Sequence, residues 1–310
     1  MNKPYSKEEY KKLKEQEYNE LQQKLDAGIK DALNSDKYKD FLKTMSKFYN
    51  YSAYNSILIG LQNENATFVA SAKNWAKQNV KINEEERGNP IKIICGYDRQ
   101  VNIYETDDKG KNILDENNKP KVKEVRTYIN FRPGYIYDIE QTSAKDDDRF
   151  RLKKESDVII KNKDKIIKGL EKITGIKIEF ANNLGRANGT YNREDNTIKV
   201  RGNMGDIKTI STSIHESAHA LLHKNKKIEK SHEQIEFEAE SVAFVVCERL
   251  GIDSKENNFL YLANWVGKED ISEFKNSISD IQRISNKMLR ELTKYQEQDL
   301  MQHQNQEQEM

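Results

Sequence analysis

The 310 residues are highly charged, which excludes several classes of protein. Charged side chains make up 33% of the chain and hydrophobic ones 35%, so we expect a cytoplasmic protein without a membrane span. The formal net charge of +1 excludes a uniformly basic nucleic-acid binder, so any DNA contact must come from one face or one domain. The length favours two domains. Cys95 and Cys247 lie far apart in apolar runs, which favours free thiols in a reducing compartment.

The first 75 residues predict helices that are rich in aromatic side chains. Residues 5–34 and 36–61 carry apolar residues at helical spacing. In residues 48–75, FYNYSAYNSILIGLQNENATFVASAKNW, rings are interleaved with amides. These side chains can form the core of a small domain, or they can stack on unpaired bases and hydrogen-bond to them; the pattern leaves both interpretations open. The candidates for DNA contacts in this stretch are Tyr51, Tyr54, Asn55 and Trp75.

From residue 91 the apolar period changes to that of strands. IKIICGY, VNIYE, KVKEVRTYINF and GYIYDI predict a small antiparallel sheet packed on the helices, with residues 107–121 as a long hairpin turn. Basic residues on these strands form either a phosphate-contacting face or simply the solvent side of the sheet. They are Lys92, Arg99, Lys121, Lys123, Arg126 and Arg132, of which Arg126 and Arg132 are taken as candidates for DNA contacts. The charged run 143–149 marks a domain boundary.

The second half contains a signature of zinc hydrolases. Residues 210–223, ISTSIHESAHALLH, carry His215, Glu216 and His219 in the order HExxH within a helical pattern. Residues four apart share one face of a helix, so both imidazoles can bind one Zn²⁺. Glu216 would then stand beside the open coordination position, where a general base acts on the bound water.

The elements around this helix follow from the same periodicities. A helix at 156–174, a strand at 176–180, a turn-rich stretch at 182–195 and a strand at 196–202 precede it. An apolar helix at 259–267, an amphipathic helix at 270–295 and a disordered tail at 296–310 follow. In zinc peptidases of this class a strand before the metal helix can pair with an extended peptide substrate. Ile198–Arg201 is the candidate edge strand for that role.

A third ligand is expected on the helix at 235–250, IEFEAESVAFVVCERL. Glu236 lies far enough beyond His219 for a reversing loop and a second, antiparallel helix. The pattern Glu236, Ala239, Glu240 resembles the gluzincin arrangement, in which one Glu binds zinc and an acidic residue one turn later orients a ligating His. The resemblance assigns Glu236 as ligand and Glu240 as the orienting residue, with the reverse order left open.

Other polar residues of this half receive different predictions. Glu238 projects away from Glu236 and Glu240 on a helical wheel, so we expect it in solvent. His223 and His232 are expected on the surface, because a straight helix carries His223 about 6 Å beyond His219. Tyr191 and Tyr261 are candidate second donors to an oxyanion.

Three stretches resemble ArdC-type antirestriction proteins of plasmids, conjugative elements and phages. NYSAYNSILIGLQNENATFVASAKNW is similar to the N-terminal single-stranded-DNA-binding domain of these proteins, and GYIYDIEQT is similar to the end of that domain. EAESVAFVVCERLGI is similar to their metallopeptidase domain. The resemblance spans both halves of the chain in the same order. It implies an α+β chain with N-terminal helices on a small antiparallel sheet, followed by a zincin-like metallopeptidase domain.

The predicted organisation is a DNA-binding domain at 1–142, a linker at 143–154, a zinc metallopeptidase domain at 155–295 and the tail at 296–310. The implied function is protection of a mobile element's incoming DNA from restriction, with single-stranded DNA and an unidentified protein as partners and no membrane. Two alternatives remain: a regulatory zinc protease that cleaves a repressor or a DNA-bound protein, and a DNA-binding module that does not need its peptidase domain. The retained Glu216 argues against a purely structural zinc site, which needs no general base.

Overall fold

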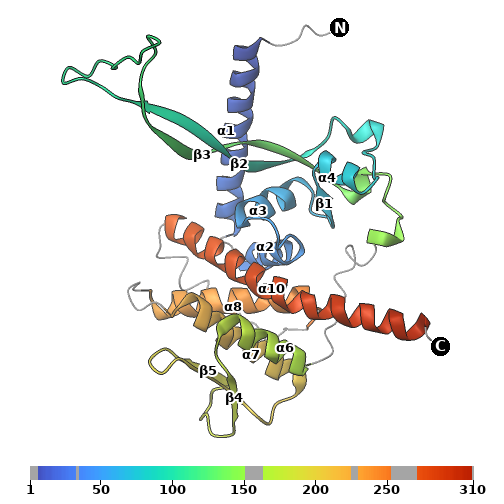
Figure 1. The fold of residues 1–310 in the computed structure, drawn as a ribbon. Coiled ribbons are helices and arrows are strands. Elements are labelled where there is room, and N and C mark those ends of the chain that lie inside the picture. Colours follow the sequence, from blue (N-terminus) through green and yellow to red (C-terminus); the bar gives the residue numbers. More distant parts are fainter. Residues whose placement is uncertain (1–5, 33–34, 151–162, 225–229, 253–270, 309–310) are drawn as a thin grey trace.

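The computed structural model describes residues 6–32, 35–150, 163–224, 230–252 and 271–308, and it confirms the predicted α+β class (Figure 1). The N-terminal half contains α1 (Lys7–Ala32), α2 (Ser35–Lys47), α3 (Ala53–Gln62), β1 (Val69–Ala70), α4 (Ala72–Lys77), β2 (Ile91–Tyr104) and β3 (Val122–Asp138), with 3-10 helices at Glu84–Glu86, Ile139–Gln141 and Asp148–Phe150. The C-terminal half contains α6 (Lys163–Thr174), β4 (Ile178–Ala181), β5 (Gly189–Asn192), β6 (Thr197–Arg201), α7 (Asp206–Leu222), α8 (His232–Arg249) and α10 (Ile271–Gln308).

The helix predicted at 36–61 is in fact two helices, α2 and α3, separated by a turn. The hydroxyl of Ser52 accepts the backbone N–H of Asn55 at 3.2 Å and caps the start of α3. Such a side-chain bond to the backbone competes with a continuous helix, and apolar periodicity alone does not reveal it. α1 packs against α2 and α3 and buries Leu21, Leu25 and Ile29.

The first sheet has the strand order β1-β3-β2 and is antiparallel, as predicted. β2 and β3 are each one long strand rather than two short ones, and they pair from Ile91↔Ile136 out to Tyr104↔Val122. Ile91, Ile93 and Ile136 are buried at the root, whereas most residues beyond Gly96 are exposed. The outer part is therefore a two-stranded ribbon that projects from the body of the protein (Figure 1).

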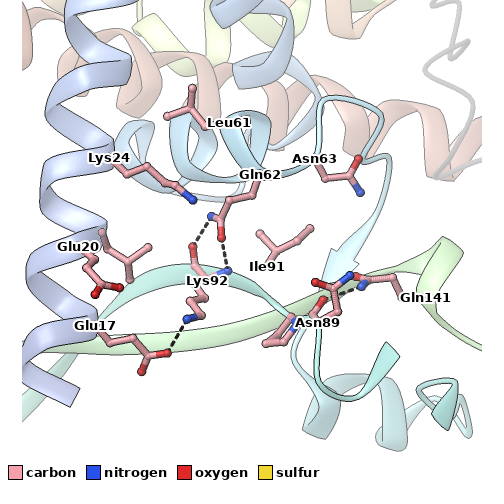
Figure 2. A pocket seen from close by; sticks show the side chains of 12 residues that line it. Glu17, Glu20, Lys24, Leu61, Gln62, Asn63, Asn89, Ile91, Lys92 and Gln141 are labelled. Carbon is pink, nitrogen blue, oxygen red and sulfur yellow. Dashed lines mark hydrogen bonds and ion pairs between the residues drawn. The ribbon is translucent and has the colours of Figure 1, made fainter. Parts of the chain in front are cut away.

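A polar pocket of about 640 Å³ lies between α1, α3 and the root of this ribbon (Figure 2). The amide of Gln62 donates to the backbone carbonyl of Lys92 at 2.8 Å and accepts its N–H at 3.0 Å. The ammonium of Lys92 lies 2.7 Å from Glu17 on α1. These bonds fix the root of the ribbon to the two helices.

The second sheet has the order β4-β6-β5, with β6 parallel to β4 and antiparallel to β5. The prediction that Ile198–Arg201 forms an edge strand is therefore wrong, because β6 is paired on both sides. The edge nearest α7 is β5, which falls in a stretch that the sequence predicts as turns. Its alternating pattern is only four residues long, which is too short for a periodicity to be recognised.

The two halves of the chain share one hydrophobic core, in which α2 packs on α8 and α10 packs on α3, α6, α7 and α8. Tyr38 on α2 is fully buried, and its hydroxyl lies 2.7 Å from that of Ser241 on α8. The amide of Gln282 on α10 donates to the carbonyls of Phe48 and Tyr51. The domain boundary near residue 142 stays a prediction, but the N-terminal helices are packed into the same core as the proposed metal-binding half.

The ends of several predicted segments differ from the structure. α10 runs to Gln308 through most of the tail predicted to be disordered, because the Gln and Glu residues there have high helix propensity. The helix predicted at 259–267, with Tyr261, and part of the helix predicted at 156–174 lie outside the described residues. Cys95 and Cys247 are free thiols, as predicted. Within the described part of the chain, no helix is long and apolar enough to cross a membrane.

Candidate metal centre

Two packed helices bring the predicted zinc ligands together. α7 buries most of its length between α6, α8 and the second sheet, which leaves little freedom to its polar side chains. α8 is capped at its start by Ser231, whose hydroxyl accepts the N–H of Gln234 at 3.2 Å. His215 and His219 are one turn apart on α7, and Glu236 projects toward them from the first turns of α8.

The three ligand atoms have a separation suited to a small metal ion. The Nε2 atoms of His215 and His219 are 3.0 Å apart, and each lies 3.5 Å from an oxygen of Glu236. Tetrahedral zinc with ligands at 2.0–2.1 Å requires ligand atoms roughly 3.4 Å apart. Two imidazole nitrogens and one carboxylate oxygen are also a common ligand set of catalytic zinc. The residues therefore fit Zn²⁺ with one position left for water.

The charges around the three residues favour metal binding. Burial lowers the pKa of His219 to about 4, which keeps its imidazole neutral. Burial opposes ionisation of Glu236, but its contacts with His215 and His219 outweigh burial and lower the pKa of this carboxyl. Burial likewise acts against protonation of His215, yet the hydrogen bond to Glu236 and the nearby carboxylates raise the pKa of His215.

Glu216 is buried beside this centre and is held from the side of β5. Burial raises its pKa to about 7, and the backbone N–H of Tyr191 donates a hydrogen bond to its carboxylate. The carboxylate packs directly on Gly189, where an added Cβ would lie 2.8 Å from the Glu216 side chain and 2.6 Å from Thr212. Gly189 was not among the predicted site residues, because a glycine in a turn-rich stretch gives no sign that a carboxylate will lie against it.

The remaining candidates of the site lie in different places. Glu240 is close enough to His215 and Glu236 for their charges to act on its carboxyl, whose pKa burial raises to about 7, but it is not one of the three convergent ligands. Its orienting role stays a prediction. The hydroxyl of Tyr191 donates to Asn196 at 3.2 Å, so the backbone of Tyr191, rather than its hydroxyl, meets Glu216.

Two predictions about exposure are wrong. Glu238 is 0% exposed and His223 is 4% exposed, although both were expected on the surface. Residues 241–247 are all buried, so α8 has no continuous solvent face into which Glu238 could turn. The nearly continuous run of apolar residues in SVAFVVC was the signal that could have revealed this. His232 is exposed, as predicted.

Four of the six candidates for DNA contacts are buried or half-buried and use their polar atoms within the protein. Trp75 is 0% exposed, and its Nε1 donates to the carbonyl of Tyr137 at 3.0 Å. Asn55 uses both atoms of its amide on the backbone of Ile94. The hydroxyls of Tyr51 and Tyr54 donate to backbone carbonyls at 3.0 and 3.4 Å. We correct the prediction for Trp75 and Asn55, because their hydrogen-bonding groups hold the backbone of the sheet.

The other two candidates, Arg126 and Arg132, lie on the ribbon. In a strand, neighbouring side chains alternate between faces and cross-strand partners share a face. The register therefore defines a basic face and an apolar face of the ribbon. The basic face carries Tyr97, Arg99, Arg126, Tyr128 and Arg132. The other face, which we call apolar after its exposed Val125, Ile129 and Phe131, also carries the polar residues Asp98, Gln100, Asn102 and Thr127. Lys92 and Lys121 are ion-paired with Glu17 and Glu105.

No protein-family model matches this chain. Among curated proteins it is similar to the uncharacterised protein pXO2-81 of Bacillus anthracis, with 27% identity over 94% of this chain and 54% of that protein. The chain thus spans about half the length of this relative.

Among solved structures it is similar to two crystal structures of the antirestriction protein ArdC from the R388 plasmid. The metal-free structure has a TM-score of 0.47, with 13% identity over 79% of this chain and 86% of ArdC. The Mn(II)-bound structure has a TM-score of 0.46, with 14% identity over 78% and 85%. Both structures are of a protein of the type that the three sequence stretches resemble, but at TM-scores below 0.5 the likeness assigns no role to any residue.

Proposed function

We propose that this chain is a zinc-dependent peptidase in which His215, His219 and Glu236 hold the metal and Glu216 is the general base. The observation that carries the proposal is the convergence of the three ligand atoms within 4.8 Å of one another beside a buried Glu216. Bound Zn²⁺ would supply Lewis acidity and lower the pKa of its water toward about 7.

The residues of the chain provide the remaining chemistry. Glu216 takes a proton from the attacking water and delivers it to the leaving amine. The N–H of Tyr191 keeps the Glu216 carboxylate in one orientation. The outer edge of β5 is unpaired among the described strands, so an extended substrate can add to it as a further strand beside Glu216.

The test compares the full-length chain with its Glu216→Gln variant on a library of unstructured peptides. The variant should bind Zn²⁺ as the wild type does and lose hydrolysis, since the ligands remain while the base is removed. Glu194→Gln, at the exposed turn between β5 and β6, is the matched control and should retain activity. Undiminished turnover of Glu216→Gln would exclude this mechanism, and a zinc-loaded wild type that cleaves no peptide would exclude the peptidase.

A second proposed activity is binding of single-stranded DNA by the basic face of the ribbon. Tyr97 and Tyr128 are exposed rings on which bases can stack, and Arg99 and Arg132 stand next to them for phosphates. The guanidinium of Arg132 lies 5.3 Å from the centre of the Tyr97 ring. Arg126 is already paired with Glu124 at 2.8 Å, so its contribution should be smaller.

The full-length chain is the right material for this test, because the N-terminal helices share their core with the second half. It should bind a labelled single strand in preference to duplex, and three phosphate contacts would give a salt slope of about −2. The double variant Tyr97→Ala, Tyr128→Ala should lose the preference, whereas Val125→Ser on the apolar face should keep it. Equal binding by both variants would remove the basic face from the proposal.

We propose protection of incoming DNA from restriction as the biological role. It is supported by the ArdC-like sequence of both halves. Expression of the chain in a restricting host should raise the survival of unmodified incoming DNA. If survival does not rise while peptide hydrolysis is present, the regulatory protease becomes the better description.

A further inference from the structure

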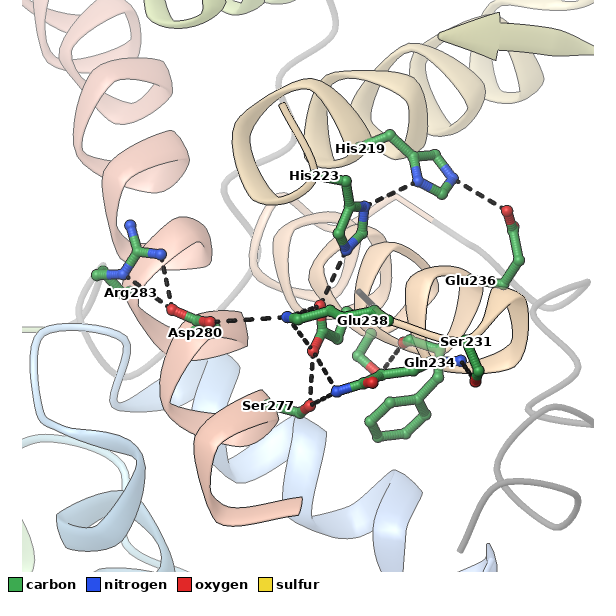
Figure 3. A network of polar contacts seen from close by, with 12 residues as sticks. His219, His223, Ser231, Gln234, Glu236, Glu238, Ser277, Asp280 and Arg283 are labelled. Atoms are coloured by element: carbon green, nitrogen blue, oxygen red, sulfur yellow. Dashed lines mark hydrogen bonds and ion pairs between the residues drawn. The ribbon is translucent and has the colours of Figure 1, made fainter. Parts of the chain in front are cut away.

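A buried chain of polar side chains leads away from His219, on the side opposite the proposed metal (Figure 3). The Nε2 atom of His219 faces His215 and Glu236, while the Nδ1 atom of His219 lies 3.2 Å from Nδ1 of His223. The other nitrogen of His223, Nε2, lies 2.9 Å from Oε2 of Glu238. Neither His223 nor Glu238 belongs to the group of convergent ligands.

The far end of this chain is built to hold an ionised carboxylate. The ammonium of Lys230 lies 2.7 Å from both oxygens of Glu238, and the hydroxyl of Ser277 donates to Oε1 at 2.6 Å. The amide of Gln234 adds a longer bond at 3.4 Å. An unpaired carboxylate at 0% exposure would be strongly destabilising, so these four donors, His223 included, account for its presence in the core.

Only one arrangement of protons lets His219 bind a metal through Nε2. A ligating Nε2 has a free lone pair, so the proton of the neutral ring must be on Nδ1. Nδ1–H then donates to Nδ1 of His223, which must be an acceptor. The proton of His223 is consequently on Nε2, where it is donated to Glu238. His219 thus donates to His223 and His223 donates to Glu238, so each bond has one donor and one acceptor.

We propose that His223 and Glu238 are positioning residues that fix the tautomer and the ring orientation of His219 for metal binding. The proposal rests on the proposed metal site, and it extends that site to α10 through Ser277. Partners of this kind behind a ligating His strengthen metal binding by about 10- to 100-fold. The imidazole of His223 lies between the two residues and links the carboxylate of Glu238 to the ring of His219.

The first measurement is the affinity of the full-length chain for Zn²⁺ in competition with a chromophoric chelator. His223→Phe keeps a ring in the buried space and Glu238→Gln keeps the shape of the side chain, and each should weaken binding about 10- to 100-fold. Ser277→Ala removes a single bond to Glu238 and should cause a smaller loss in a protein that remains folded.

Tyr38→Phe is the matched control for a general disturbance of α8. It removes a buried hydroxyl that contacts Ser241, while Ser241 still donates to the carbonyl of Phe237 at 2.7 Å. This variant should lower the melting temperature and leave the affinity for Zn²⁺ unchanged. The proposal is overturned if Tyr38→Phe weakens Zn²⁺ binding as much as Glu238→Gln does. It is also overturned if neither His223→Phe nor Glu238→Gln weakens Zn²⁺ binding.

The second measurement is the tautomer of His219 in the metal-free protein, read from its ¹⁵N chemical shifts above pH 8. The wild type should carry the proton on Nδ1, and His223→Phe should shift it toward Nε2. A wild-type proton on Nε2 would overturn the proposal even if the variants lose metal. A wild type that binds no Zn²⁺ but shows the Nδ1 tautomer would instead contradict the proposed metal site and leave the chain of bonds standing.

Discussion

The α7–α8 pair and the β2–β3 ribbon differ in how tightly they hold their side chains. On the helices, Glu238 and His223 are buried, and each is held by several partners at 2.6–3.2 Å. On the ribbon, apolar Ile129 is 68% exposed, and side chains on both faces meet solvent. The helices thus fix a few atoms accurately, as a metal site requires, whereas the ribbon offers a large surface that a partner can cover.

The largest contrast should appear in stability. Ile214 on α7 is 0% exposed, so Ile214→Ala should cost about 2–5 kcal/mol of unfolding free energy, measured in urea. The same change at Ile129 on the ribbon should stay within about 0.5 kcal/mol. Equal losses at both positions would mean that the ribbon is packed in solution and that the contrast is false.

The metal site provides the next test. Removing a ligand should cost more than the roughly 100-fold loss of affinity caused by removing an outer partner. Glu236→Ala should therefore lose Zn²⁺ on dialysis, whereas Glu240→Ala should retain it with reduced affinity, as measured by metal analysis. An empty site in Glu240→Ala with a full site in Glu236→Ala would reverse the ligand order.

A substitution at Gly189 tests how accurately the Glu216 side chain must be positioned. Gly189→Ala would force the buried Glu216 side chain to move, and a displacement near 1 Å can cost about 100-fold in turnover. Zn²⁺ content should not change. Gly88→Ala, where an added Cβ meets nothing within 4 Å, is the control and should leave turnover intact. Normal turnover in Gly189→Ala would show that the Glu216 carboxylate does not need this contact.

The smallest effect is expected at the root of the ribbon. Burial acts against ionisation of Glu17, but its bonds to Lys14, Lys92 and Tyr135 lower its pKa from 4.5 to about 2. The stabilisation by this lowered pKa is complete above pH 4.5 and is lost as the pH falls toward 2. Because the partners are partly exposed, Glu17→Gln should cost under about 1 kcal/mol at pH 7. A cost that is the same at pH 2.5 and pH 7 would contradict this pKa.

The sequence predicted a feature well where all of its residues lie on one helix or on one pair of strands, because their spacing then follows the period of that element. His215 and His219 are one turn apart, so the HExxH motif alone predicts that they share a face of α7. The strands of the ribbon were predicted from the alternation of their side chains over many residues. The partners of Glu238 come instead from three separate parts of the chain, at His223, Lys230 and Ser277. No local period carries that information. The burial of Trp75 could not be predicted for the same reason, because its ring packs against Phe68 and Phe150 and its Nε1 donates to a carbonyl of β3.

The shared core also has a consequence for synthesis on the ribosome. Tyr38 meets Ser241, which is 203 residues later in the chain, and Tyr51 meets Gln282, which is 231 residues later. At about 5–20 residues per second, α2 emerges roughly 10–40 s before the helix that covers it. During that interval the nascent chain exposes the ring of Tyr38 where Phe237 on α8 and Phe274 on α10 later pack against it. We therefore expect nascent chains to require chaperones until α8 and α10 have left the ribosome.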